Sequence, residues 1–262
     1  MNRSTLAAML LLGSGCAHVL AVAPPPLTVA PGALSVRAEP PCRASDLAEV
    51  ARAAREALPA LVRWGALSAP VSVVVVPSHE ALEAAAHHAG FPWLRAWARY
   101  DVVYLQAPHT WGLFEGTPAQ LRDVLMHELT HCAMFQASAG PDDWVGRHIP
   151  FWFREGLASW AAGQGGRRWS RRELGRTLAR APALDPLEDG DALSQSDPGL
   201  AYSAAHWAVA DLAARSGEVA LRRLLSTMKA GAAFDVAFHS VYGESVWRFE
   251  HGFLEALRRG VP

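Results

Sequence analysis

Lysine, cysteine and blocks of positive charge are all scarce in this sequence. Lys229 is the only lysine among 24 basic residues, arginine supplies the others, and the formal net charge of the chain is −1. A protein that binds nucleic acid concentrates positive charge on one surface, so the lack of any basic block argues against that class of partner. We attribute the excess of arginine over lysine to the base composition of the genome and not to a mechanism.

A long hydrophobic run is missing as well. The apolar stretch Leu6–Leu12 is too short to span a bilayer, and with Arg3 before it and small residues up to Cys16 after it, it is typical of an export signal. The ending resembles a bacterial lipoprotein signal in which Cys16 carries the lipid, although Gly13 stands where leucine is usual. We therefore expect residues 1–16 to be a signal peptide. The mature chain is then a lipoprotein of the periplasm or outer membrane that contacts the membrane only through its lipid, or alternatively a secreted protein.

Residues 17–43 contain Pro24–Pro26 and Pro40–Pro41, which predicts an extended tether between the signal and the folded domain. Apart from Cys16, the only cysteines are Cys42 and Cys132. An oxidising compartment permits a disulfide between them. The alternative is that Cys132 is simply a small buried residue of a helix.

The remaining residues, 44–262, predict one globular domain, because 51% of the chain is apolar and 19% is charged. We expect two lobes, 44–140 and 141–262, in an α+β fold with a mixed sheet in the first lobe and mostly helices in the second. The patterning predicts the following elements: a helix at 44–61, a strand at 71–76, a helix from Ser78 to 86, a strand at 101–106, and helices at 171–180, 200–215, 218–230 and 245–259, with a Pro/Asp/Gly-rich loop at 181–198.

The most informative motif is His127-Glu128-Leu-Thr-His131. Apolar residues recur around it at helical spacing, and Thr117-Pro118 offers a helix cap followed by a first-turn proline. Two histidines four positions apart lie on one face of a helix, so both imidazoles can bind one zinc ion. Glu128 lies beside them, where a carboxylate can act on water instead of binding the metal.

A catalytic zinc ion usually takes three protein ligands, so a third ligand is needed. Glu155, in the motif Pro150-Phe-Trp-Phe-Arg-Glu155-Gly-Leu-Ala158, opens an apolar helical stretch and is the preferred candidate. A third histidine of the metzincin kind is excluded because Ala137 occupies its position. Ligands from the intervening loop remain open alternatives: Asp142, Asp143 and His148.

The two motifs together resemble the gluzincin metallopeptidases, most closely the peptidase MA-like domains of bacterial secreted proteins and lipoproteins. The resemblance covers roughly two-thirds of the chain, and only the two metal motifs are specific. It implies a zincin-like fold, one zinc ion held by His127, His131 and Glu155, and Glu128 as general base. The chain departs from the pattern at Phe153-Arg154, where relatives often have an aliphatic and a variable residue.

Four further assignments are less specific. Tyr202 is the candidate donor to the oxyanion, with His206 one helical turn later as its competitor and a packed helical tyrosine as the other reading. Asp123, one turn before His127, is a candidate for orienting an imidazole, unless it is a solvated surface residue. Strand residues 102–106 could pair with an extended substrate or be an ordinary core strand. Trp152 is the best candidate among the tryptophans for lining a pocket, although aromatic residues are most often core.

The leading functional hypothesis is zinc-dependent hydrolysis of a peptide or protein substrate at the bacterial cell envelope. The main alternative is a catalytically silent binding module or envelope assembly factor with the same fold. Glu128 argues against that alternative, because a structural zinc ion needs no general base and usually has four protein ligands. Neither the substrate nor the oligomeric state follows from the sequence.

Overall fold

The computed structural model describes residues 34–61, 66–112 and 115–260. Within these ranges the chain forms a four-stranded sheet in the order β1-β2-β4-β3 and nine α-helices. The predicted mixture of a sheet in the first half and helices in the second is confirmed. The predicted signal peptide, residues 1–16 with Cys16, lies outside the described residues.

The sheet is mainly parallel. Strands β1 (Leu34–Ala38), β2 (Val71–Val76) and β4 (Val102–Gln106) run parallel, and the short strand β3 (Ala96–Ala98) pairs antiparallel with β4 at the edge. Strand β1 lies inside the segment predicted to be a tether, 17–43, so that prediction was wrong at its C-terminal end. The flanking prolines suggested an extended linker, but pairing with β2 satisfies the backbone of Leu34–Ala38 within the fold.

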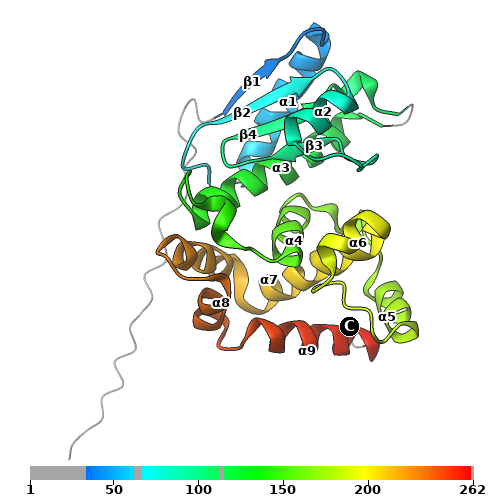
Figure 1. Ribbon diagram of the computed structural model, residues 1–262, viewed down its shortest axis with the longest axis vertical. Coiled ribbons are helices and arrows are strands. Elements are labelled where there is room, and N and C mark those ends of the chain that lie inside the picture. The colour runs from blue at the N-terminus through cyan, green and yellow to red at the C-terminus, as the bar shows by residue number, and fades with distance from the viewer. Residues whose placement is uncertain (1–33, 62–65, 113–114, 261–262) are drawn as a thin grey trace, which may run out of the picture.

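Strand β2 explains how the sheet is covered on both faces. Its alternate residues Val71, Val73 and Val75 belong to the main core, whereas Val74 and Val76 belong to a smaller cluster with Leu82 of α2 (His79–Ala86). Side chains alternate between the two faces of a strand, so a run of valines serves two cores at once. Figure 1 shows α1 (Ala44–Leu61) and α3 (Pro118–Ser138) on one face of the sheet and α2 on the other.

The second half of the chain is helical. It comprises α4 (Phe151–Ala161), α5 (Arg171–Arg180), α6 (Gly190–Ser196), α7 (Pro198–Lys229), α8 (Phe234–Tyr242) and α9 (Val246–Arg258), with single turns of 3-10 helix at Pro108–Thr110, Trp144–Arg147 and Gln164–Arg167. The two helices predicted at 200–215 and 218–230 form α7, which breaks at Gly217, where φ is 73°. Helix α6 lies in the segment predicted to be a loop, 181–198, and α8 was not predicted.

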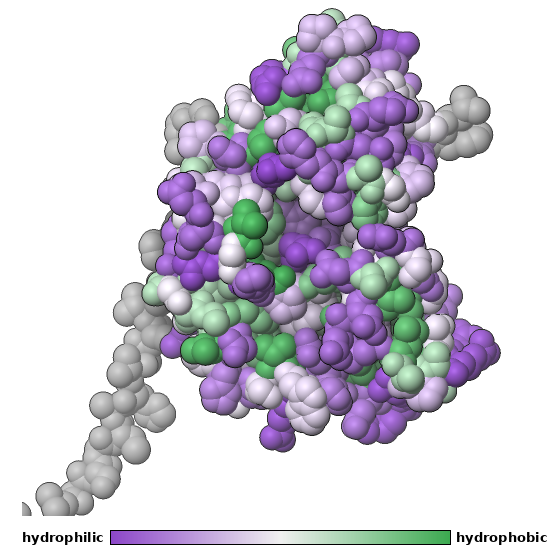
Figure 2. Space-filling model, in the orientation of Figure 1, coloured by the Kyte–Doolittle hydropathy of each residue, from purple (hydrophilic) through white to green (hydrophobic). Residues whose placement is uncertain are grey.

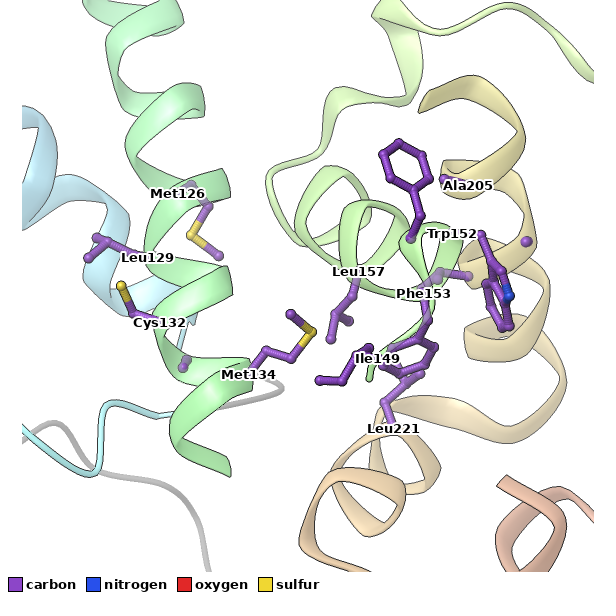
Figure 3. Packing of buried hydrophobic residues seen from close by; sticks show 14 of the residues in the cluster. Met126, Leu129, Cys132, Met134, Ile149, Trp152, Phe153, Leu157, Ala205 and Leu221 are labelled. Atoms are coloured by element: carbon purple, nitrogen blue, oxygen red, sulfur yellow. The ribbon is translucent and has the colours of Figure 1, made fainter. Parts of the chain in front are cut away.

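The core continues between α3 and the helical part. Figure 3 shows Met134 of α3 pointing toward Leu157 of α4 and Ile149, with Phe153 packed behind them against Leu221 of α7. This contact fixes α4 against α3. It therefore determines which residues of the two helices meet.

Two further observations concern the cysteines and the membrane. Cys42 and Cys132 are both free, so the possible disulfide is not formed, and the Cys132 thiol instead donates to the carbonyl oxygen of Arg99 at 3.1 Å. Among the residues described, no helix is both long enough and apolar enough to cross a bilayer.

Candidate metal centre

Helix α3 carries the His127 and His131 side chains, and its start is determined by local sequence. The Thr117 hydroxyl accepts a hydrogen bond from the Gln120 N–H at 3.3 Å, and the Gln120 side chain accepts one from the Thr117 N–H at 3.1 Å. Pro118 occupies the first helical turn, where a missing N–H costs nothing. The predicted cap is therefore confirmed, and with it the helical face that both histidines share.

Helix α4 carries Glu155, and the next residue sets how closely this helix approaches α7. A Cβ atom at Gly156 would lie 2.2 Å from the carbonyl oxygen of Ala205, which no real side chain tolerates. Only glycine permits this crossing. The Glu-Gly pair in the sequence thus combines a polar side chain aimed at α3 with a backbone pressed against α7.

The two helices bring His127, His131 and Glu155 together. The Oε2 atom of Glu155 lies 3.3 Å from His127 Nε2 and 3.5 Å from His131 Nε2, and the three possible ligand atoms all lie within 4.8 Å of one another. The exposed fractions of the three side chains are only 12%, 9% and 11%. This buried group of two imidazoles and one carboxylate can hold a metal ion, as the preferred ligand assignment requires.

The electrostatics keep the Glu155 carboxylate ionised. Burial acts to raise its pKa, but His131 and His127, together with Arg154, outweigh burial and hold the pKa well below its usual range. The Nε atom of Arg154 donates a hydrogen bond to Glu155 Oε1 at 3.1 Å. Oε1 is the carboxylate oxygen that does not face the histidines. Sequence reasoning treated Arg154 only as a departure from a pattern and missed this contact, although its position next to Glu155 was visible.

The Nδ1 atoms of both histidines are buried, and neither has a hydrogen-bond partner among the described residues. The prediction that Asp123 orients an imidazole was therefore wrong. Its carboxylate accepts a hydrogen bond from Arg167 at 2.6 Å and one from Arg122 at 3.3 Å. Arg167 lies 44 positions later in the chain, which explains why helical spacing alone gave the wrong partner.

Glu128 lies outside the three-residue cluster and faces the sheet edge. Its carboxylate accepts a hydrogen bond from the backbone N–H of Ala98 in β3. Burial, and to a lesser extent the charge of Glu155, raise the pKa of Glu128 to about 7 against the opposing effect of His127. The strand beside the candidate site is thus β3, the last strand of the sheet. Residues 102–106 form the inner strand β4, which confirms the reading of an ordinary core strand and excludes the one in which they pair with a substrate.

Tyr202 of α7 lies close enough to the cluster to sense its charges. Burial and the carboxylates of Glu155 and Glu128 raise the pKa of Tyr202 well above its usual value. Its ring makes edge contacts with Trp93, at 5.6 Å between centroids, and with Phe151, at 5.5 Å, and the Arg168 guanidinium lies 5.4 Å from its centre. Tyr202 therefore lies within electrostatic range of the cluster. Its catalytic role remains a prediction.

His206, the competitor of Tyr202, is engaged elsewhere. Its Nδ1 atom lies 3.0 Å from the hydroxyl of Ser159, which also accepts a hydrogen bond from Arg168 Nε at 3.0 Å. Burial, with the positive charges of Arg168 and Arg171, lowers the pKa of His206 to about 4. His206 is therefore a neutral, buried member of a polar network within the helical part.

The other candidates lie outside the metal-binding cluster. Asp142 is exposed, and the Asp143 carboxylate accepts hydrogen bonds from the Gly140 N–H and from Arg147. Neither these residues nor His148 belongs to a ligand cluster in the described part of the chain. Trp152 is fully buried, donates to Glu250 at 2.6 Å and packs among aromatic side chains of α8 and α9, which confirms the core reading over the pocket-lining one.

Figure 2 shows a hollow between the part of the molecule that carries the sheet and the helical part, with hydrophilic residues at its floor. The candidate metal cluster is built from α3 and α4, the two helices that face each other across this boundary in Figure 1. No protein-family model matches the chain, and no curated protein sequence matches it. Any assignment of activity therefore rests on the residues themselves.

Proposed function

We propose that this chain is a zinc-dependent peptidase with a zincin-like fold and a gluzincin ligand set of His127, His131 and Glu155. The observation that carries the proposal is the spacing of the ligand atoms. Zinc bonds to nitrogen and oxygen of about 2.0–2.2 Å require ligand atoms about 3.4 Å apart at the corners of a tetrahedron. Glu155 Oε2 lies 3.3 and 3.5 Å from the two histidine nitrogens, and all three ligand atoms lie within 4.8 Å of one another.

The donor set itself favours zinc over the harder cations. Two imidazoles and one carboxylate suit zinc, whereas magnesium and calcium prefer sites built from oxygen ligands alone. Three protein ligands leave a fourth position open, which is typical of catalytic zinc and not of structural zinc. When bound there, zinc supplies a Lewis acid that acidifies water and polarises a carbonyl group.

Glu128 is the proposed general base. It follows His127 directly and stays outside the ligand cluster, so its carboxylate is free to accept a proton from the attacking water and return it to the leaving amine. The Ala98 N–H orients this carboxylate by a hydrogen bond. Tyr202 is the proposed donor to the oxyanion, since the charges of Glu155 and Glu128 both act on it.

Strand β3 is the proposed position of the substrate backbone. It lies at the edge of the sheet, pairs with β4 on one side only, and includes the residue that contacts Glu128. An open strand edge can add an extended peptide as a further strand. The proposed location of this reaction is the cell envelope, on the basis of the lipoprotein-like signal that ends at Cys16.

The test compares the wild-type protein with Glu128→Gln. Both should bind about one zinc ion per chain by elemental mass spectrometry, and only the wild type should cleave members of a peptide library. Equal cleavage by both proteins would exclude Glu128 as the base. Zinc binding without cleavage of any peptide by the wild type would instead favour the binding module.

A further inference from the structure

The two oxygen atoms of the Glu155 carboxylate have different neighbours. Oε2 faces His127 and His131, whereas Oε1 accepts a hydrogen bond from Arg154 Nε at 3.1 Å. A free carboxylate can bind a metal ion through one oxygen or through both, and these two modes give different coordination numbers. In this structure the second oxygen is already engaged by a cation.

Arg154 is itself held in place by two further contacts. Its Nη2 atom donates to Asp191 of α6 at 3.2 Å, and its guanidinium lies 5.7 Å from the centre of the Phe151 ring. The guanidinium is planar and presents its donors in a rigid fork, so binding Asp191 with one nitrogen fixes the direction of the other toward Glu155. The Glu155 carboxylate is buried, whereas the Asp191 side chain is 79% exposed, so Asp191 steadies the guanidinium only as a surface ion pair does. The exposed fraction of the arginine side chain is 30%, and that of Glu155 is 11%.

We infer that Arg154 is a positioning residue that restricts Glu155 to a single ligand oxygen, and that Asp191 supports it in this role. The inference rests on the proposed function, because it assigns a role toward the metal ion. It also explains the arginine that stands before the glutamate of the second motif. With Oε1 engaged by Arg154, the coordination number of the metal stays low and a position remains open for water and substrate.

Two measurements on the purified full-length chain test this role. The first is zinc affinity, determined by competition with a chelator, for the wild type and Arg154→Gln. Loss of a residue that orients a ligand typically weakens metal affinity by about 10–100-fold, and we expect at least about 10-fold here. The second is the visible absorption of the cobalt-substituted protein. Four-coordinate cobalt absorbs much more strongly than five- or six-coordinate cobalt.

In Arg154→Gln the freed Oε1 can join Oε2 on the metal, so the cobalt absorption should fall as the coordination number rises. Arg154→Lys retains the charge but has no fork that can orient two carboxylates, and it should show a smaller fall in both measurements. If the glutamine variant does not fold, the Arg154→Lys variant still tests whether Arg154 restricts Glu155 to one ligand oxygen. The matched control is Arg171→Gln, which removes an ion pair with Asp211 elsewhere in the helical part and should change neither measurement.

Unchanged zinc affinity in the folded Arg154 variants would overturn the inference. So would weaker affinity with an unchanged cobalt spectrum, because Arg154 would then influence the metal without controlling its coordination number. A wild-type protein that binds no metal would overturn the proposed function itself. That result is seen before any variant is compared, so the two failures are distinct.

Discussion

Gly156 of α4 packs directly against the backbone of Ala205 in α7. A Cβ atom at Gly156 would come within 2.2 Å of the Ala205 carbonyl oxygen, and Glu155 is the residue immediately before Gly156 in α4. The position of the candidate ligand therefore depends on a packing contact on another side of the same helix. This coupling of helix packing to the metal cluster gives the first prediction.

Gly156→Ala should destabilise the protein and weaken metal binding together. The new methyl group must push α4 away from α7, which costs about 1–3 kcal/mol in free energy of unfolding and displaces Glu155 from the histidines. Chemical denaturation and zinc affinity measure the two effects. The control is Gly252→Ala in α9, where a Cβ atom would meet nothing within 4 Å and helix propensity should raise stability slightly. Equal unfolding free energies and equal zinc affinities in Gly156→Ala and Gly252→Ala would contradict the packing argument.

Glu155→Gln should greatly reduce bound zinc while leaving the fold intact. The amide is nearly the same size as the carboxylate but carries no charge, so the site keeps only two strong ligands. The zinc content, measured by elemental mass spectrometry after dialysis, should fall from about one ion per chain to well below that. Asp142→Asn is the control, since Asp142 is exposed and outside the ligand cluster. Normal zinc content in Glu155→Gln would move the search for the third ligand to Asp143 and His148.

Tyr202→Phe should lower kcat by roughly 100-fold with little change in KM, the effect expected when one oxyanion donor is removed. Steady-state kinetics on a peptide identified from the library provide the measurement. Tyr242→Phe is a matched control, because the hydroxyl of Tyr242 is buried in the helical part and has no partner among the described residues. A Tyr202→Phe enzyme with wild-type kcat would remove this residue from the mechanism.

His206 should make the stability of the metal-free protein depend on pH. Its folded pKa of about 4 lies below the ordinary value of 6.5, so the unfolded chain binds a proton more readily between these values. Stability contributed by the neutral imidazole is present above pH 6.5 and is lost as the pH falls toward 4. Between pH 7 and pH 5 the loss should be about 2 kcal/mol, measured by urea denaturation in the presence of a chelator. The His206→Gln variant should lose correspondingly less stability over this interval, and an equal loss would show that other groups cause it.

The local parts of the site were predictable because their causes are local. The capping box of Thr117 and Gln120, the proline beside it and the spacing of His127 and His131 all act within one helix. The valine run of β2 was also recognisable as a buried strand, since it fits a sheet that is covered on both faces. These features depend on residues that are close in the chain.

The failures share the opposite property. Asp123 meets Arg167 and Leu34–Ala38 pairs with β2, and in both cases the partner lies more than 30 positions away in the sequence. Spacing within a helix cannot reveal such partners. Strand β3 is only three residues long and carries no detectable alternation, so the true edge of the sheet was missed.

The sequence by itself thus determined the helix that carries the two histidines, the glutamate beside them and the class of fold, because capping, periodicity and residue chemistry act over a few positions. Only the tertiary structure decided which carboxylate completes the cluster, which strand borders it and what holds Glu155. Those outcomes depend on the packing of α4 between α3 and α7. Side-chain volume and close backbone contact between distant segments determine that packing, and the order of residues along the chain does not reveal it.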